Sequence, residues 1–422
     1  MIKKNLVYLF YSLSIGLFAQ NVSISPYSSI GIGDFKFDND VVINSVGGLG
    51  STYTSENGGE INFSNPAANR NLYYTTFNVS GNSDLYKLES NLSSEQRSNS
   101  YVSNLSIGFP ISQQVKFGIG YQPYTGVGYE SKVNTSNESP NYSSTFKGNG
   151  GLNSLHTITS YSPNKNWSFG IRLNYLFGNI DKTQEITLEN GFTTGTVKKY
   201  ELNSLQITPG FTYNRKINKR YLLTSGGTIG VSTDLKTDLN FLHSTYFHPE
   251  GFPNTKLNES IIDEYSKKST TKLPTNYSFG VAFSKESKWM LGIEYKGQQL
   301  SDLQLPEENY SFSSQSRFAF GGWIIPDRNS YKSYLSRVTY RFGMYYENTG
   351  ISLNNNSINQ YGVEFGLGLP VGKAKQNPTM MNIGVELGQR GTKDNNLFLE
   401  NFAKIKIGFN LSDRWFKKTT YD

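Results

Sequence analysis

Apolar and polar residues alternate one by one along much of this chain. Within 288–300, for example, Leu291 and Ile293 alternate with Gly292 and Glu294. A period of two predicts β-strands that have one apolar face. The opposite faces carry Gly, Asn, Glu, Lys and Arg, which are too many charges for the inside of a soluble sandwich. A transmembrane β-barrel accommodates both faces, because its apolar face meets lipid and its polar face lines the lumen.

The alternation recurs often enough to count strands. Single-chain bacterial barrels require an even number, and the pattern gives about 14. We therefore predict an all-β fold, a transmembrane antiparallel β-barrel of about 14 strands with an N-terminal plug in the lumen. The predicted strands are 72–84, 98–109, 115–131, 151–161, 166–180, 193–213, 219–232, 274–284, 288–300, 312–325, 335–346, 358–370, 379–391 and 397–411.

The lengths of the links between these strands support the same fold. The links at 111–114, 162–165 and 285–287 are turn-sized, whereas those after the third, seventh and ninth strands are long and polar. The longest covers 233–273. Outer-membrane barrels have short periplasmic turns and longer external loops, so we expect the long links outside the cell.

The start of the chain has the features of a secretory signal. Lys3 and Lys4 precede an apolar run over 6–18, and cleavage is expected before Gln20. The chain has no Cys, which excludes a lipid anchor on cysteine, disulfides and thiol chemistry. We therefore predict a signal peptide over 1–19 and a location in the outer membrane of a Gram-negative cell.

Residues 20–71 precede the first strand and are rich in Ser, Gly and Asn. Apolar islands such as Ile30 and Ile32 are unusual for a disordered leader, which is the alternative. Many glycines are expected to point into the lumen, where they would let another backbone approach closely. We therefore expect 20–71 to be a plug inside a barrel formed by 72–422.

Composition changes this picture little. The mean hydropathy of −0.49 is polar, as expected when alternating strands average out. The formal charge of +7 is not gathered into a basic patch, so nucleic-acid binding is not expected. The expected contacts are outer-membrane lipid, a hydrophobic small molecule, and protein partners in an outer-membrane complex.

A short motif before the first strand resembles the FadL family of outer-membrane transporters of hydrophobic compounds. The motif is Asn65, Pro66 and Ala67, preceded by a Gly-rich stretch at 46–53, and 273–281 is similar to a late strand of that family. The resemblance implies a fourteen-stranded barrel whose N-terminal segment plugs the lumen. The last third is similar to a branch associated with the Bacteroidota; its matching segments are 340–346, 365–370 and 415–418, with 25–31 near the start.

A proline in the third predicted strand is the first candidate site. Pro123 cannot donate to a ladder, and Tyr124 and Gly126 follow it. The FadL resemblance implies an inward kink here that opens a lateral exit for ligand. The alternatives are a harmless bulge or an earlier strand end, and Pro209 shows that strand prolines occur elsewhere.

The link 233–273 is the second candidate site, because it carries exposed aromatic residues. It could capture an apolar ligand or a protein partner, or it could simply pack over the barrel mouth. The residues are Phe241, Leu242, Tyr246, Phe247 and Phe252.

Charged residues at inward positions of the last four strands are the third candidate site. Opposite signs fall on neighbouring strands, which favours ion pairs that brace the wall and hold the plug. The alternative is an anchor for a ligand carboxylate through Arg341 or Lys404. The residues are Arg341, Glu364, Glu386 and Lys404.

The three histidines give no catalytic or metal site. His243 and His248 lack the spacing of a metal site, and no catalytic motif surrounds His156. No enzyme activity, metal or cofactor is therefore expected. Two functions remain: passive uptake of hydrophobic or amphipathic small molecules, fatty-acid-like, with lateral exit at the strand-three kink, or an accessory barrel in an outer-membrane secretion or assembly complex.

Overall fold

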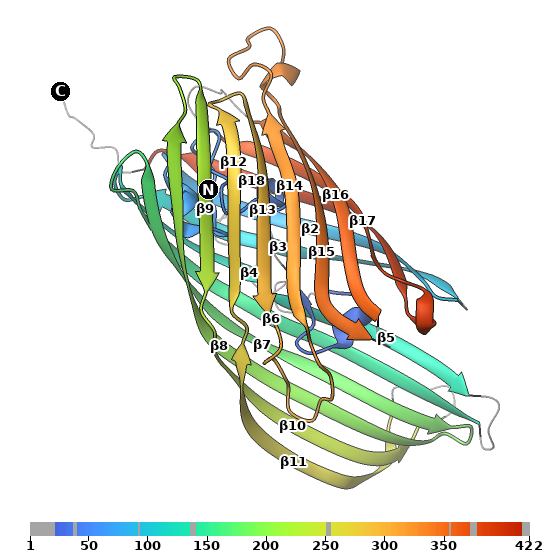
Figure 1. The fold of residues 1–422 in the computed structure, drawn as a ribbon. Coiled ribbons are helices and arrows are strands. Elements are labelled where there is room, and N and C mark those ends of the chain that lie inside the picture. The colour runs from blue at the N-terminus through green and yellow to red at the C-terminus, as the bar shows by residue number, and fades with distance from the viewer. Residues whose placement is uncertain are drawn as a thin grey trace, which may run out of the picture.

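The computed structural model describes residues 22–36, 40–91, 93–135, 141–249, 255–353, 356–371 and 378–415. In this part of the chain the strands close into one antiparallel barrel of 14 strands, and the last strand, β18, pairs with the first, β2 (Figure 1). The predicted fold class is confirmed. Among the same residues, no helix is long and apolar enough to cross a membrane.

Three barrel strands are each interrupted once, and the two pieces carry separate labels. The interruption at Pro274 has a direct cause, because proline supplies no N–H to the ladder. The barrel strands are β2 (Thr75–Glu89), β3 (Ser94–Pro110), β4 (Val115–Pro123) with β5 (Thr125–Thr135), β6 (Tyr142–Tyr161), β7 (Trp167–Leu188), β8 (Phe192–Lys216), β9 (Tyr221–Gly230) with β10 (Thr233–Phe247), β11 (Leu257–Leu273) with β12 (Asn276–Lys285), β13 (Trp289–Gln299), β14 (Ser314–Ile324), β15 (Thr339–Leu353), β16 (Asn356–Pro370), β17 (Met380–Gly391) and β18 (Leu399–Asp413).

The first part of β7, from Trp167 to Tyr175, shows how the wall meets lipid. Every second side chain there is apolar and exposed, and the side chains between them are polar or small and face the lumen. A band of this length fits the roughly 9–11 residues with which a tilted strand crosses a bilayer. The exposed residues are Trp167, Phe169, Ile171, Leu173 and Tyr175.

Beyond this band the alternation reverses. Leu176 and Ile180 point inward and are fully buried, whereas Asn179 on the outer face is polar and exposed. Strands β5, β6, β7, β8, β10 and β11 continue past the band as one curved sheet, which we call the extension and which Figure 1 draws at the bottom. We call the extension the upper part of these strands and the lipid-facing band the lower part. Its concave side holds an apolar cluster that includes Leu202, Leu239 and Leu305.

The prediction that 233–273 is a long loop is wrong. Residues 233–247 and 257–273 form the hairpin β10–β11, and β10 also pairs with β8 from Lys236 to Phe247. The chain stays extended because it keeps the period of two: Leu235 and Leu239 are buried on one face, and polar residues occupy the other.

The segment before the first strand lies inside the barrel. It contains η1 (Pro26–Ser29), the two-residue strand β1 (Asp34–Phe35), α2 (Val41–Asn44) and η2 (Pro66–Asn69). It touches opposite sides of the wall: a Cβ at Gly366 would lie 2.4 Å from the Ser45 Cβ, and one at Gly170 would lie 2.5 Å from the Pro66 backbone. Wall glycines therefore make room for this segment. Two further short helices, η3 (Leu335–Arg337) and η4 (Asp394–Asn396), lie in links between strands.

Candidate functional site

The wall is interrupted where the sequence places a proline in the third barrel strand. β4 ends at Pro123, and β5 begins at Thr125. The register against β6 changes from Pro123 opposite Asn153 to Val127 opposite Gly150, so the third strand contains one extra residue, as in a β-bulge. We call this point the strand-three break.

The break removes the pairing between the second and third barrel strands. β3 pairs with β4 only from Leu105 opposite Tyr121 to Pro110 opposite Lys116. Among the described residues, the ladder does not resume between the upper part of β3 and β5. The described parts of β3 and β5 therefore share no backbone ladder, and we call the line between them the seam; the Arg97 guanidinium crosses it and donates to the Glu130 carbonyl at 2.8 Å.

Two glycines let the backbones of neighbouring strands approach closely beside the break. Gly151 has a φ of 140°, and a Cβ on it would lie 2.4 Å from the Thr125 carbonyl oxygen. A Cβ on Gly178 would lie 2.0 Å from the Gly151 carbonyl oxygen. Side chains at these two positions would push β5, β6 and β7 apart, so the close approach of these strands depends on their absence.

The chain's own N-terminal residues cover the inner side of the seam. Asp34 and Phe35 pair with Gly126 and Thr125. The Gly128 N–H donates to Ser28 Oγ at 3.0 Å, and the Gly126 Cβ position lies 3.0 Å from the Val22 Cβ. Residues 22–36 therefore occupy the edge of β5 over its first residues, 125–128.

A groove of about 520 Å³ opens beside the break. Tyr121, Pro123 and Tyr175 line it together with polar residues such as Asn179 and Glu201. These are the levels at which the outer face of β7 changes from apolar to polar. The groove therefore lies at the margin of the lipid-facing band.

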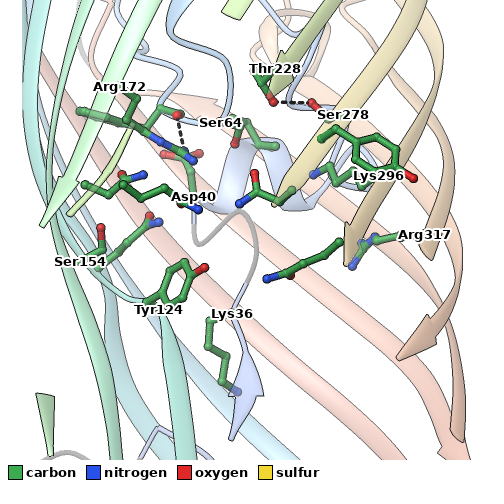
Figure 2. Close-up of a pocket in the computed structure, with 18 of the residues that line it drawn as sticks. Lys36, Asp40, Ser64, Tyr124, Ser154, Arg172, Thr228, Ser278, Lys296 and Arg317 are labelled. Atoms are coloured by element: carbon green, nitrogen blue, oxygen red, sulfur yellow. Dashed lines mark hydrogen bonds between the residues drawn. The ribbon is translucent and has the colours of Figure 1, made fainter. Parts of the chain in front are cut away.

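A second cavity, of about 110 Å³, lies in the lumen beside the break, and Tyr124 is one of the residues that line it (Figure 2). Its walls carry both polar and apolar groups: the Arg172 guanidinium donates to the Phe63 carbonyl at 2.7 Å, Thr228 and Ser278 share a hydrogen bond of 2.8 Å, and Ile43 and Ile61 add apolar surface. Such a mixed lining suits an amphipathic molecule. Its charged residues are Lys36, Asp40, Arg172, Glu294, Lys296 and Arg317.

The apolar cluster of the extension reaches from the break to the β10–β11 hairpin. Val127 and Leu152 lie beside the break and are fully buried, as is Leu239 on β10, and Tyr124 packs against the cluster. Leu300, which follows β13, is a buried member of the cluster. This apolar region is therefore continuous but closely packed.

The predicted lumen charges all face inward and form ion pairs. Lys404 Nζ lies 3.0 Å from Glu386 Oε1, and Lys406 bridges Glu386 at 2.6 Å and Glu364 at 3.7 Å. Arg341 is 3.5 Å from a carboxylate oxygen of each of Glu56 and Glu60. The last two residues belong to the interior segment.

Some members of this network were missed in the sequence. Arg390 Nη1 contacts Asp34 at 2.8 Å, and Arg317 Nη1 contacts Glu347 at 3.3 Å. One feature of the sequence could have indicated the Arg390–Asp34 pair. The N-terminal segment is rich in Ser, Gly and Asn and contains a few isolated acidic residues, Asp34 among them, which would need cations inside the barrel. Pairs this far apart in sequence have no local pattern.

The Asn-Pro-Ala motif joins the interior segment to the wall. The Asn65 side chain caps η2 by accepting from the Ala67 N–H at 3.0 Å, and its amide donates to the carbonyls of Ser51 at 2.7 Å and Phe211 at 3.1 Å. Pro66 lies against Gly170. These contacts support a positioning role for the motif.

Four of the five residues predicted as an external capture loop lie in strand β10 instead. Phe241 packs against the apolar cluster, and Tyr246 is buried and donates to Glu185 at 2.5 Å. Leu242 is half-buried, and Phe247 is exposed. These four residues do not form one loop surface, because strand alternation directs neighbouring side chains to opposite faces. Phe252 lies outside the described residues.

A metal site is not found among the residues that the structure describes. His156 faces the lumen, is buried, and lies edge-on to the Phe63 ring at 4.6 Å. No group of three or more His, Asp or Glu side chains in this part of the chain could hold a metal ion.

Together, the closed ladder, the lipid-facing band and the filled lumen define a transmembrane β-barrel. The family model named BamG matches residues 1–422, so the chain belongs to the BamG family. No curated protein matches the sequence.

Solved structures with a similar fold include the P. putida toluene transporter TodX, with a TM-score of 0.57 and 14% identity, covering 89% of this chain and 98% of that one. The monoaromatic hydrocarbon channel CymD gives 0.54 and 12%, covering 90% and 99%. A Pseudomonas aeruginosa FadL homologue gives 0.51 and 12%, covering 94% and 98%. At such identities the likeness establishes the fold alone, and the Bacteroidota branch and the signal peptide stay predictions.

Proposed function

We propose that this barrel resides in the bacterial outer membrane and takes up hydrophobic or amphipathic small molecules passively. A molecule enters from the side of the extension, passes along the apolar cluster, and leaves sideways into the bilayer through the strand-three break. Residues 20–71 act as the plug that prevents free passage of water and ions.

The observation that carries this proposal is that the backbone ladder is missing between the described parts of β3 and β5. Each ladder hydrogen bond contributes roughly 1 kcal/mol, so a wall without them opens at lower cost than the rest of the barrel. The seam adjoins a groove lined partly by the lipid-facing Tyr175. The fold is also shared with the toluene transporter TodX and the monoaromatic hydrocarbon channel CymD.

The route is closed by the chain itself, so uptake requires residues 22–36 to move away from β5. A disulfide between Val22→Cys and Gly126→Cys would prevent that movement. Disulfides join Cβ atoms about 3.5–4.5 Å apart. The Gly126 Cβ position lies 3.0 Å from the Val22 Cβ, so a small adjustment suffices. The native chain has no Cys, which makes the bond unique.

We expect the oxidised double variant to lose uptake of toluene and of a long-chain fatty acid, and the reduced form to recover it. The wild type and each single-cysteine variant are the controls and should be indifferent to reductant. Equal uptake by the oxidised and reduced forms would exclude the break as the exit.

A second candidate is an accessory subunit of an outer-membrane protein complex. It is favoured by the charged lining of the lumenal cavity and by the extension, whose outer face is polar and reaches beyond the lipid-facing band. Native mass spectrometry of the full-length protein extracted in mild detergent separates the two: co-purifying small molecules support uptake, and a stoichiometric protein partner supports the subunit role.

A further inference from the structure

The extension is an open sheet, so it has two edges, and these edges differ in the contacts that other parts of the chain make with them. One edge is β5, whose first residues, 125–128, are covered by residues 22–36 through β1 and Ser28, and whose Glu130 carbonyl accepts from Arg97. The other edge is β11. Among the described residues, β11 has no backbone partner other than β10 (Figure 1).

β11 is an edge because its next neighbour leaves the ladder. β13 ends at Gln299, whose N–H donates to the Thr275 carbonyl at 3.0 Å. The chain then turns inward, and Leu300, Leu303 and Leu305 enter the apolar cluster. Filling the cluster thus removes the strand that would otherwise continue beside β11.

The exposed edge is regular from Asp263 to Leu273, and a bulge at Ile262 interrupts it towards the tip of the hairpin. β11 has 17 residues and no proline, and its pairing with β10 is unbroken from Thr233 opposite Leu273 to His243 opposite Asp263. Every second residue of such a strand directs its N–H and C=O away from the neighbour. Soluble sheets avoid an edge of this kind with short strands, prolines, bulges or lysines, because it accepts another strand.

The lysines of β11 are already engaged within the chain. Lys268 pairs with Asp238 at 3.6 Å, Lys272 pairs with Asp234 at 2.5 Å, and Lys267 pairs with Glu307 on the concave side at 2.8 Å. The Lys267 hydrogen bond lowers the pKa of Glu307.

Towards the tip of the hairpin the charge is acidic. Asp263 and Glu264 are exposed and have no ion pair among the described residues, and Ile261 and Ile262 beside them are more than half exposed. One end of the free edge therefore offers uncompensated negative charge beside apolar surface.

We propose that β11 is a docking edge for an extended segment of another exported protein, which adds to the extension as a β-strand and carries Lys or Arg where it passes Asp263 and Glu264. Backbone hydrogen bonds give the affinity, and the acidic pair and the two isoleucines set the register. This inference supplies a contact surface for the subunit candidate and does not depend on uptake.

The test uses the full-length protein in nanodiscs and a fluorescent ten-residue peptide of alternating Val and Thr with two Lys residues. A matched peptide is N-methylated on alternate residues, which removes the donors of one edge without changing charge. We expect N-methylation to weaken binding at least tenfold, and hydrogen exchange to show protection within 257–272. Equal binding of the two peptides, or protection elsewhere, for example on β3, would overturn the proposal.

A charge exchange locates the register without disturbing the sheet, because both acidic side chains are exposed. The variant Asp263→Lys/Glu264→Lys should lose the Lys peptide and gain a Glu peptide of the same design. An unchanged preference for the Lys peptide would overturn the assigned polarity. Disulfide-linked dimers of a Ser266→Cys variant in membranes would indicate a second copy as occupant and overturn the commitment to a different protein.

Subunit role and strand addition can fail separately. A stoichiometric partner in native mass spectrometry, combined with no peptide binding at β11, would leave the accessory candidate in place and remove this edge from it. Peptide binding together with redox-dependent uptake would show that both activities belong to one barrel.

Discussion

In the lipid-facing (lower) part of a strand the apolar side chains point outward, and in the extension (the upper part of the same strand) they point inward. On the lower part of β8, Leu205 and Ile207 face outward and Gln206 faces inward. On the upper part, Glu201 faces outward and Leu202 is buried inside. The backbone ladder continues through the change, so only the surroundings differ.

This reversal shows where the bilayer ends. In lipid, apolar side chains are stable outside and charges need a closed interior; in water, the arrangement is that of a soluble sheet with an apolar core. The lower interior consequently contains buried ion pairs such as those of Arg341 beside the apolar contacts of the interior segment, whereas the interior of the extension is mainly an apolar cluster with the buried pair Lys182–Glu308. The two parts should respond differently to the same kinds of substitution.

The largest effect is expected in the lower interior. Arg341→Met leaves Glu56 and Glu60 buried without their cation, and breaking a buried pair in this way costs about 3–5 kcal/mol. Guanidinium unfolding followed by tryptophan fluorescence in detergent measures the loss. Adding Glu56→Gln and Glu60→Gln to the same variant should recover most of the stability. If the triple variant is as unstable as Arg341→Met, the unpaired carboxylates of Glu56 and Glu60 are not the cause of the lost stability.

A smaller and more local effect is expected in the upper interior. Leu239→Ala opens a cavity in the apolar cluster and should cost about 2–5 kcal/mol. Hydrogen exchange should rise in β8, β10 and β11 while the lower barrel stays protected. Leu242→Ala, on the opposite face of β10, is the matched control and should have little effect. Uniform exchange over the whole barrel would show that the extension does not unfold independently.

The sequence predicted the barrel and its inward charges because both follow from one period of two. The hairpin at 233–273 was missed because its aromatic residues were interpreted as a loop surface. The signal was present, since Leu235 and Leu239 keep the period while Asp234, Lys236 and Asp238 occupy the outer face. A strand that leaves the membrane shows a change of phase, not an end of alternation.

The acidic partners of the lumen charges could not be predicted in the same way. Glu56 and Glu60 meet Arg341 across more than 280 residues, and nothing in the local pattern of either segment encodes that contact. The strand-three break could be predicted only in part. Pro123 marked its position, but the missing ladder between β3 and β5 depends on where β3, β6 and the N-terminal residues lie in space.

The smallest effect tests the boundary between the two parts. Leu205→Lys places a charge on the lipid-facing side of β8, and Asn203→Lys places the same charge two residues further toward the extension. A lysine costs about 2–4 kcal/mol at the middle of a bilayer and about 0–1 kcal/mol near its surface, so Leu205→Lys should lose about 1 kcal/mol and Asn203→Lys almost nothing. Folding titrations into liposomes compare the two. Equal losses at both positions would move the lipid boundary further along the strand and place part of the extension inside the membrane.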